Sequence, residues 1–145
     1  MTSQGPQSAE FAGAAPASGR RNEKQLKLSL EAGHSGSALV LHCQGRMILR
    51  KEAQALSKIV AEALPSAQRM VVDLAGVDAV DSGGLGELVL THMWAEAAGY
   101  TLKYASPRKS VRRLFESTNL AAVFDVFDSV PEAMAAMVRE EKHTA

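Results

Sequence analysis

The sequence has little of several features that define specialised classes of protein. It contains a single cysteine, so no internal disulfide can form, and Cys43 lies in an apolar run that predicts a buried thiol. Its sixteen basic and sixteen acidic residues cancel, whereas a protein that binds nucleic acid through phosphate contacts normally carries a basic excess. The densest basic group is predicted to be a solvated helix face, formed by Arg108, Lys109, Arg112 and Arg113. We therefore expect neither a disulfide scaffold nor a nucleic-acid partner.

Long apolar runs are missing as well. No stretch approaches the roughly 18 residues that a membrane-spanning helix needs. The first 25 residues contain no hydrophobic core of a signal peptide. We therefore expect a cytoplasmic protein with no direct membrane insertion.

The composition divides the chain into a tail and one domain. Residues 1–24 are rich in serine, glycine, alanine, proline and glutamine, with almost no large apolar side chain besides Phe11. Such a segment cannot bury enough surface to offset the entropy lost on ordering, so we predict a disordered tail. Residues 25–141 are predicted to form one domain around one core.

Strand and helix patterns alternate along the predicted domain. Alternation with a period of two over residues 26–30, followed by the apolar run at 38–43, predicts a hairpin of two strands. Helical spacing follows over residues 53–64, and Pro65 is expected to end that helix. A short run rich in β-branched residues at 70–74 is typical of a buried central strand.

The second half of the domain continues this alternation. After the central strand we expect a second helix that ends at Gly99 and whose core face carries Leu85, Leu88, Val89 and Met93. A strand at 102–105 and a helix capped by Ser106 should follow it. The domain should then end with a strand at 123–127 and a final helix capped by Ser129. Trp94 lies off the expected core face, as an interface anchor or as a lid over the sheet edge. This order predicts an α/β fold with a mixed β-sheet of about five strands and four helices.

The turn between the central strand and the second helix carries residues suited to a switch. Residues 80–86 are Val-Asp-Ser-Gly-Gly-Leu-Gly, and Ser82 falls where the N-cap of the helix is expected. Amides of a first helical turn lack intrahelical acceptors, so a phosphate on Ser82 would meet free N–H groups and the positive end of the helix dipole. A partner covering this turn would meet about two added negative charges beside Asp81. The simpler interpretation is a serine-capped turn without a switch.

Catalytic motifs around Ser82 are incomplete. A nucleophile elbow needs glycine two residues before the serine, and that position is Val80. His92 lies about 15 Å away by helix rise, too far to act as a base for Ser82. The four histidines lack metal-ligand spacing, and no lysine follows the glycines as a phosphate-binding loop requires. We therefore expect no enzyme, no metal site and no cofactor.

The sequence resembles the STAS domains of the anti-sigma factor antagonists. The resemblance runs from about Leu26 to Val138 and implies a single STAS-like domain. It rests on the strand at 71–74 with the spacer 75–77, the signature at 81–86, Ser106-Pro107 followed by residues 111–115, and residues 118–120 before Phe124 and Phe127.

The resemblance implies a bacterial protein-binding module that regulates transcription and is switched by phosphorylation. In these antagonists the unphosphorylated domain binds an anti-sigma factor, often a serine kinase of the histidine-kinase-like ATPase fold, and thereby frees a sigma factor. The kinase phosphorylates the serine after the aspartate, and a serine phosphatase restores it. The matching phosphorylation site here is Ser82. The expected partner-binding residues are Asp81, Ser82, Gly83, Gly84, Leu85 and Leu88.

Two places depart from the family pattern. The second serine or threonine that usually follows the phosphoacceptor is Gly83 here. Before the first long helix, residues 45–48 are Gly-Arg-Met-Ile, where members often have Gly-Glu-Leu-Asp. Alternatives with the same fold are a STAS subunit of a lipid-transport ABC complex and a stressosome-type scaffold subunit, each binding its partner through the same corner of the domain.

Overall fold

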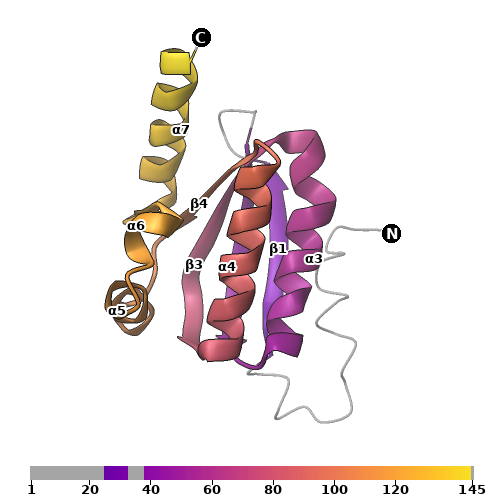
Figure 1. The fold of residues 1–145 in the computed structure, drawn as a ribbon, viewed down its shortest axis with the longest axis vertical. Helices are drawn as coiled ribbons and strands as arrows, with labels where there is room; N and C mark the ends of the chain where they lie inside the picture. Colours follow the sequence, from indigo (N-terminus) through magenta and orange to yellow (C-terminus); the bar gives the residue numbers. More distant parts are fainter. Residues whose placement is uncertain (1–24, 33–37, 145) are drawn as a thin grey trace.

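The computed structural model describes residues 25–32 and 38–144. The predicted tail at 1–24 and the hairpin turn at 33–37 lie outside these residues. The described part confirms the α/β fold, with five strands and five helices. In chain order these are β1 (Lys27–Ala32), β2 (Leu39–Met47), α3 (Arg50–Ala67), β3 (Arg69–Val80), α4 (Ser82–Ala97), β4 (Thr101–Ala105), α5 (Lys109–Ser117), α6 (Ala121–Phe124), β5 (Val126–Phe127) and α7 (Val130–Thr144) (Figure 1).

The five strands lie side by side in the order in which they occur along the chain. β1 and β2 form the predicted antiparallel hairpin, and β2, β3, β4 and β5 run parallel to one another. The carboxyl ends of the parallel strands therefore meet at one edge of the sheet. The loop from β2 to α3 and the turn from β3 to α4 both lie at that edge, where binding sites of such sheets commonly form.

Helices cover the two faces of the sheet differently (Figure 1). α3 and α4 lie side by side on one face and, with α5 and α6, cover the main core, whose largest buried side chains are Leu41, Leu56, Leu64, Met70, Leu74, Leu88, Tyr104, Phe115 and Phe124. α7 packs on the other face through a smaller apolar cluster. None of the helices described is both long and apolar enough to cross a lipid bilayer.

α3 ends later than predicted. Pro65 lies inside the helix, which continues to Ala67. A proline in the last turn removes only its own N–H bond to the preceding turn, so the helix survives for two more residues. Gln68 then adopts a left-handed conformation, with φ 70°, and its N–H donates to the Leu64 carbonyl oxygen at 2.6 Å.

α5 begins later than predicted. Ser106 has φ 61° and donates its hydroxyl to the Asp128 carbonyl oxygen, so it does not cap the helix, which starts at Lys109. The expected cap of α7 is confirmed, because Ser129 Oγ accepts the Glu132 N–H at 3.2 Å. The predicted strand at 123–127 is shortened to β5, since its first residues close the short helix α6.

Candidate functional site

The start of α4 is attached to the loop that follows β2. Asp81 is the N-cap residue, and its Oδ1 accepts the Gly84 N–H at 2.8 Å. Its Oδ2 accepts the Leu49 N–H at 2.9 Å, and its own N–H donates to the Met47 carbonyl oxygen at 3.3 Å. The N–H groups of Gly84 and then Leu49 hold the pKa of Asp81 below its ordinary value. An ionised carboxylate therefore joins α4 to the β2–α3 loop.

Ser82 is the first residue of α4 and is exposed. The prediction that Ser82 caps the helix is wrong, because Asp81, in an extended conformation one residue earlier, directs its carboxylate at the amide of Gly84. Some of the amides expected to receive a phosphate are thus already bonded. A phosphate on Ser82 would project into solvent beside the Asp81 carboxylate.

Two glycines let the β2–α3 loop approach the first turn of α4. A Cβ atom on Gly84 would lie 2.0 Å from the Met47 carbonyl oxygen, and one on Gly83 would lie 2.9 Å from the Arg50 backbone nitrogen. Both neighbours are backbone atoms, so a side chain at either position would push the loop and the helix apart. The resemblance leads us to expect serine or threonine at position 83. The close approach of the loop explains why glycine is present there instead.

The β2–α3 loop also exposes a leucine that sequence reasoning missed. Leu49 is 60% exposed and has φ 67° and ψ 133°. A positive φ is unfavourable for leucine, and the hydrogen bond from its N–H to Asp81 helps to hold it there. The one sequence signal was an apolar residue between a strand end and a helix start. A strained backbone with an exposed apolar side chain next to the Ser82 turn marks Leu49 as a contact candidate.

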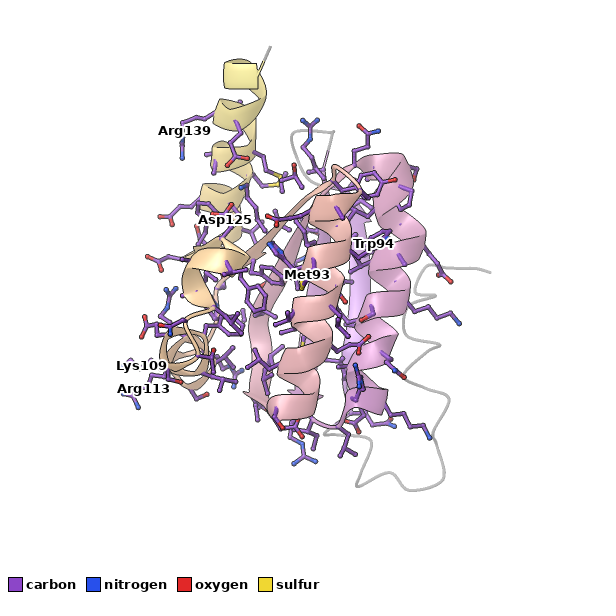
Figure 2. All side chains as sticks on the ribbon, viewed as in Figure 1. Met93, Trp94, Lys109, Arg113, Asp125 and Arg139 are labelled. Atoms are coloured by element: carbon purple, nitrogen blue, oxygen red, sulfur yellow. The ribbon has the colours of Figure 1, made fainter. Side chains whose placement is uncertain are left out.

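The outer side of α4 carries an apolar row. Leu90, Met93 and Trp94 are 50%, 58% and 39% exposed, and Figure 2 labels the last two on this helix. Met93 was predicted to be a core residue, and that prediction is wrong. Leu88 was predicted to contact the partner. It is only 1% exposed and packs in the main core, so it cannot form part of the surface that a partner meets. Leu85 is half-buried and remains partly accessible.

Polar side chains occupy the side of α4 that faces α3, which explains the error at Met93. Glu87 and Thr91 are buried. Ser57 Oγ donates to Glu87 Oε2 at 2.8 Å and lies 2.7 Å from Thr91 Oγ1. Arg50 Nε donates to the other Glu87 oxygen at 3.2 Å. The inner face of α4 is thus partly polar, and a hydrophobic pattern alone assigns the wrong face to the core.

His42 lies on the sheet face opposite α4, away from Ser82. Its Nδ1 is 2.6 Å from Asp73 Oδ2, and its Nε2 is 3.3 Å from Glu31 Oε2. Burial lowers the pKa of His42, but the hydrogen bonds to Asp73 and Glu31 outweigh it, and the pKa is raised overall. Among the described residues, no group of three or more histidine, cysteine, aspartate or glutamate side chains is placed to hold a metal ion.

The basic residues of α5 and its approach divide into two kinds. Arg108 donates to the Ala75 carbonyl oxygen at 2.8 Å and pairs with the Asp78 carboxylate, which ties the start of α5 to the end of β3. Arg112 donates to the Asp128 carboxylate at 2.7 Å. Lys109 and Arg113 are exposed and point away from the domain in Figure 2. The predicted solvated face is therefore confirmed for these two.

A family model covers most of the described residues. The model described as "Mlab, STAS domain" matches residues 30–140. The chain belongs to the STAS domain family. The match includes the Ser82 turn, the β2–α3 loop and all of α4.

Solved structures share the fold of this STAS domain. An anti-sigma factor antagonist from Mycobacterium paratuberculosis is 20% identical, and the match covers 78% of this chain and 94% of that one with a TM-score of 0.67. The anti-sigma factor antagonist SpoIIAA in its unphosphorylated form is 16% identical, and the match covers 76% of this chain and 95% of that one with a TM-score of 0.61. SpoIIAA of Bacillus has also been solved in a phosphorylated form. The murine anion transporter Slc26a9 is 11% identical over 77% of this chain and 22% of its own, with a TM-score of 0.61.

Proposed function

We propose that this STAS domain is a bacterial anti-sigma factor antagonist whose binding is switched by phosphorylation of Ser82. The observation that carries the proposal is an exposed Ser82 at the first position of α4, at one end of an exposed apolar surface. The unphosphorylated domain would bind an anti-sigma factor in the cytoplasm and so free a sigma factor. The partner would be a serine kinase of the histidine-kinase-like ATPase fold, and a serine phosphatase would reverse the modification.

The proposed docking surface runs along α4 from the Ser82 turn. Its members are exposed or half-buried, and they come from the β2–α3 loop and the outer side of α4: Leu49, Ser82, Leu85, Leu90, Met93 and Trp94. Ser82 and Trp94 are about 18 Å apart by helix rise, a distance that one face of a partner domain can cover. Trp94 packs on the ring of Tyr100 with centroids 5.7 Å apart, which limits its motion and suits it to anchor a partner.

Phosphorylation would act on the partner more than on the fold. The phosphate would carry about two negative charges beside the Asp81 carboxylate. Because Ser82 is exposed, the free domain would keep the phosphate hydrated and lose little stability. A partner that covers Ser82 would have to remove water from these charges next to a like charge, which commonly costs several kcal/mol.

The test compares aspartate and alanine at Ser82. We expect Ser82→Asp to weaken binding of the purified anti-sigma factor at least about tenfold, and Ser82→Ala to bind as the wild type does. The matched control is Ser66→Asp, at an exposed site about 24 Å from the start of α3 by helix rise. Isothermal titration calorimetry gives the affinities, and thermal unfolding of each variant reports stability.

Two results would contradict the proposal. If Ser82→Asp binds as tightly as Ser66→Asp, the serine lies outside the interface. If Ser82→Asp loses stability in proportion to affinity, the serine is structural. Incubation with ATP and the kinase, followed by mass spectrometry, must also place a phosphate on Ser82 in the wild type and none in Ser82→Ala.

A second candidate uses the same docking surface without phosphorylation, as a STAS subunit of a lipid-transport ABC complex. The occupied amide at the start of α4 favours it, because Asp81 already accepts the Gly84 N–H that a phosphate on Ser82 would use. Mass spectrometry of the protein from its native cells separates the candidates, since only the first requires phosphorylated Ser82.

A further inference from the structure

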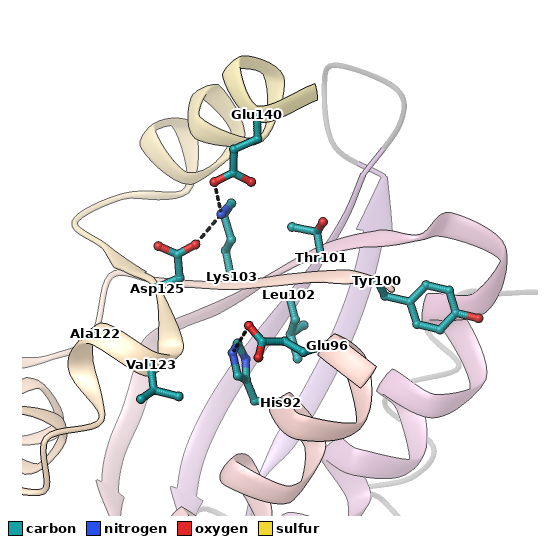
Figure 3. Close-up of a pocket in the computed structure, with 10 residues that line it drawn as sticks. All are labelled: His92, Glu96, Tyr100, Thr101, Leu102, Lys103, Ala122, Val123, Asp125 and Glu140. Atoms are coloured by element: carbon teal, nitrogen blue, oxygen red, sulfur yellow. Dashed lines mark hydrogen bonds and ion pairs between the residues drawn. The ribbon is translucent and has the colours of Figure 1, made fainter. Parts of the chain in front are cut away.

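A cavity of about 390 Å³ opens at the edge of β4 (Figure 3). It lies at the end of α4 remote from Ser82, and one of its lining residues, Tyr100, also packs on Trp94 of the docking surface proposed above. His92 and Glu96 lie on one side of the strand, and Lys103, Asp125 and Glu140 lie on the other. The cavity therefore follows the strand edge and is lined by residues from both faces of the sheet.

The main chain at this edge has pairing groups that β5 does not reach. The Thr101 N–H donates to Gln68 at the β3 side, whereas the Tyr104 N–H donates to Asp125 on the side of β5. Main-chain groups alternate in direction along a strand, so the N–H and C=O of Leu102 face the same side as those of Tyr104. β5 pairs only with Tyr104 and Ala105, and Leu102 lines the cavity. An open strand edge of this kind accepts a further strand.

His92 forms part of the wall on the α4 side. It is 3% exposed, and in the part of the chain that the structure describes neither ring nitrogen has a hydrogen-bond partner. Its Nε2 lies 3.4 Å from Glu96 Oε2, and the Glu96 side chain is 68% exposed. The ring packs against Phe124 with centroids 5.5 Å apart. A buried imidazole without hydrogen bonds is rare, and here it borders a cavity that a ligand can enter.

An ionic cluster lines the other side of β4. Lys103 is 2% exposed, and its Nζ lies 2.5 Å from Asp125 Oδ2 and 2.9 Å from Glu140 Oε2. Burial lowers the pKa of Lys103, but the hydrogen bonds to the two carboxylates raise it overall, so the ammonium stays charged. This side therefore suits a polar group. The α4 side offers the Glu96 carboxylate. Among the described residues, its one ionic neighbour is the His92 ring.

We propose that the β4 edge binds an extended segment of a partner protein that carries an arginine or lysine, as an added strand. The segment's main chain would pair with Leu102. Its basic side chain would point to the α4 side and donate to the exposed Glu96 carboxylate beside the His92 ring. The next residue would point to the opposite side and meet the ionic cluster of Lys103, because side chains alternate along a strand.

The chemistry of the edge favours a basic side chain over an acidic one. The Glu96 carboxylate is an acceptor, and an arginine supplies several donors in one plane. An acidic side chain would face the Glu96 carboxylate directly. The size of the cavity and the short free length of β4 restrict the pairing to a few residues.

The test uses a fluorescent pentapeptide with a central arginine flanked by threonines, titrated into the full chain. We expect fluorescence anisotropy to show binding, and NMR hydrogen exchange to show slower exchange of the Leu102 N–H when the peptide is present. N-methylation of the peptide's central amides should weaken binding about tenfold, the effect of a lost main-chain hydrogen bond. Replacing the arginine with glutamate should abolish it.

Matched protein variants locate the contact. Glu96→Gln should weaken binding about twofold to fivefold, as expected for an exposed ion pair. Glu62→Gln, the same change at an exposed site on α3, should leave it unaltered. Ser82→Asp should also bind the peptide as the wild type does, because Ser82 lies about 15 Å from His92 by helix rise.

Several results would overturn the proposal. One is the absence of binding at millimolar peptide. Another is binding that leaves the exchange of the Leu102 N–H unchanged, or binding that tolerates N-methylation. Equal competition by free butane-1,4-diamine would show a site for small amines in place of strand addition.

Discussion

Three glycines near the start of α4 give a graded test of the contact between this helix and the β2–α3 loop. At Gly86 an added Cβ would meet nothing within 4 Å, at Gly83 it would lie 2.9 Å from backbone, and at Gly84 only 2.0 Å. Replacing each by alanine adds the same methyl group to the same helix. Differences among the three variants therefore report the space available at each position.

The expected free energies of unfolding follow from these distances. Gly86→Ala should stabilise the domain by about 0.5–1 kcal/mol, because alanine loses less backbone entropy in a helix. In Gly83→Ala a similar gain is offset by overpacking of about 1–3 kcal/mol, so a small net loss is expected. In Gly84→Ala the Met47 carbonyl must move by more than an ångström, which disturbs the hydrogen bonds of Asp81, and we expect a loss of at least about 3 kcal/mol.

Urea unfolding followed by circular dichroism measures the three values. The expected order of stability is Gly86→Ala, then wild type, then Gly83→Ala, then Gly84→Ala. For a domain of this size, about 1 kcal/mol corresponds to a Tm change of several degrees, so thermal unfolding resolves the ends of the series. If Gly84→Ala is as stable as Gly86→Ala, the loop is not packed against α4 as described, and the steric account of Gly83 fails with it.

Two further predictions concern buried and paired charges. Lys103→Met should change the free energy of unfolding by less than about 1.5 kcal/mol, because the Asp125 and Glu140 carboxylates are 49% and 56% exposed and regain water. The double variant Asp125→Asn with Glu140→Gln leaves the Lys103 ammonium buried without its counter-charges and should lower the free energy of unfolding by about 3–5 kcal/mol. If urea unfolding shows a larger loss for Lys103→Met than for the double variant, this reasoning is refuted. The raised pKa of His42 stabilises the fold below its unfolded value of 6.5, and this contribution is lost as the pH rises through the folded pKa. The stability difference between wild type and His42→Gln should therefore be larger near about pH 5.5 than near about pH 8.5, and equal differences at both would contradict it.

The element order was predictable because it depends on local patterns. The β-branched run at 70–74 and the alternation at 26–30 each have one simple structural solution, and the structure places both in the sheet. The cap at Ser129 was predictable for the same reason, since its partner is three residues away. Boundaries failed at Pro65 and Ser106, where hydrogen bonds to other residues decide where each helix ends or begins.

The position of the candidate site was predictable, but its internal contacts were not. Sequence reasoning placed Ser82 at the start of a helix, which is confirmed. It could not show that Asp81 reaches Leu49, because those residues are 32 positions apart and meet only when β2 and β3 pair. The buried polar contacts of Glu87 come from α3, 30 and 37 residues away, and they decide that Met93 faces solvent.

The contacts of α4 determine how a charge on Ser82 can act. The helix is held at its start by the Asp81 carboxylate and along its length by Glu87, through Ser57 and Arg50. Rotation of α4 to relieve a phosphate would break both sets of hydrogen bonds, whereas hydration of an exposed side chain breaks neither. The phosphate is therefore expected to change the surface that a partner meets while the backbone stays in place. Since β4 and the far end of α4 would then stay unchanged, peptide binding at the Leu102 edge should persist when Ser82 is phosphorylated.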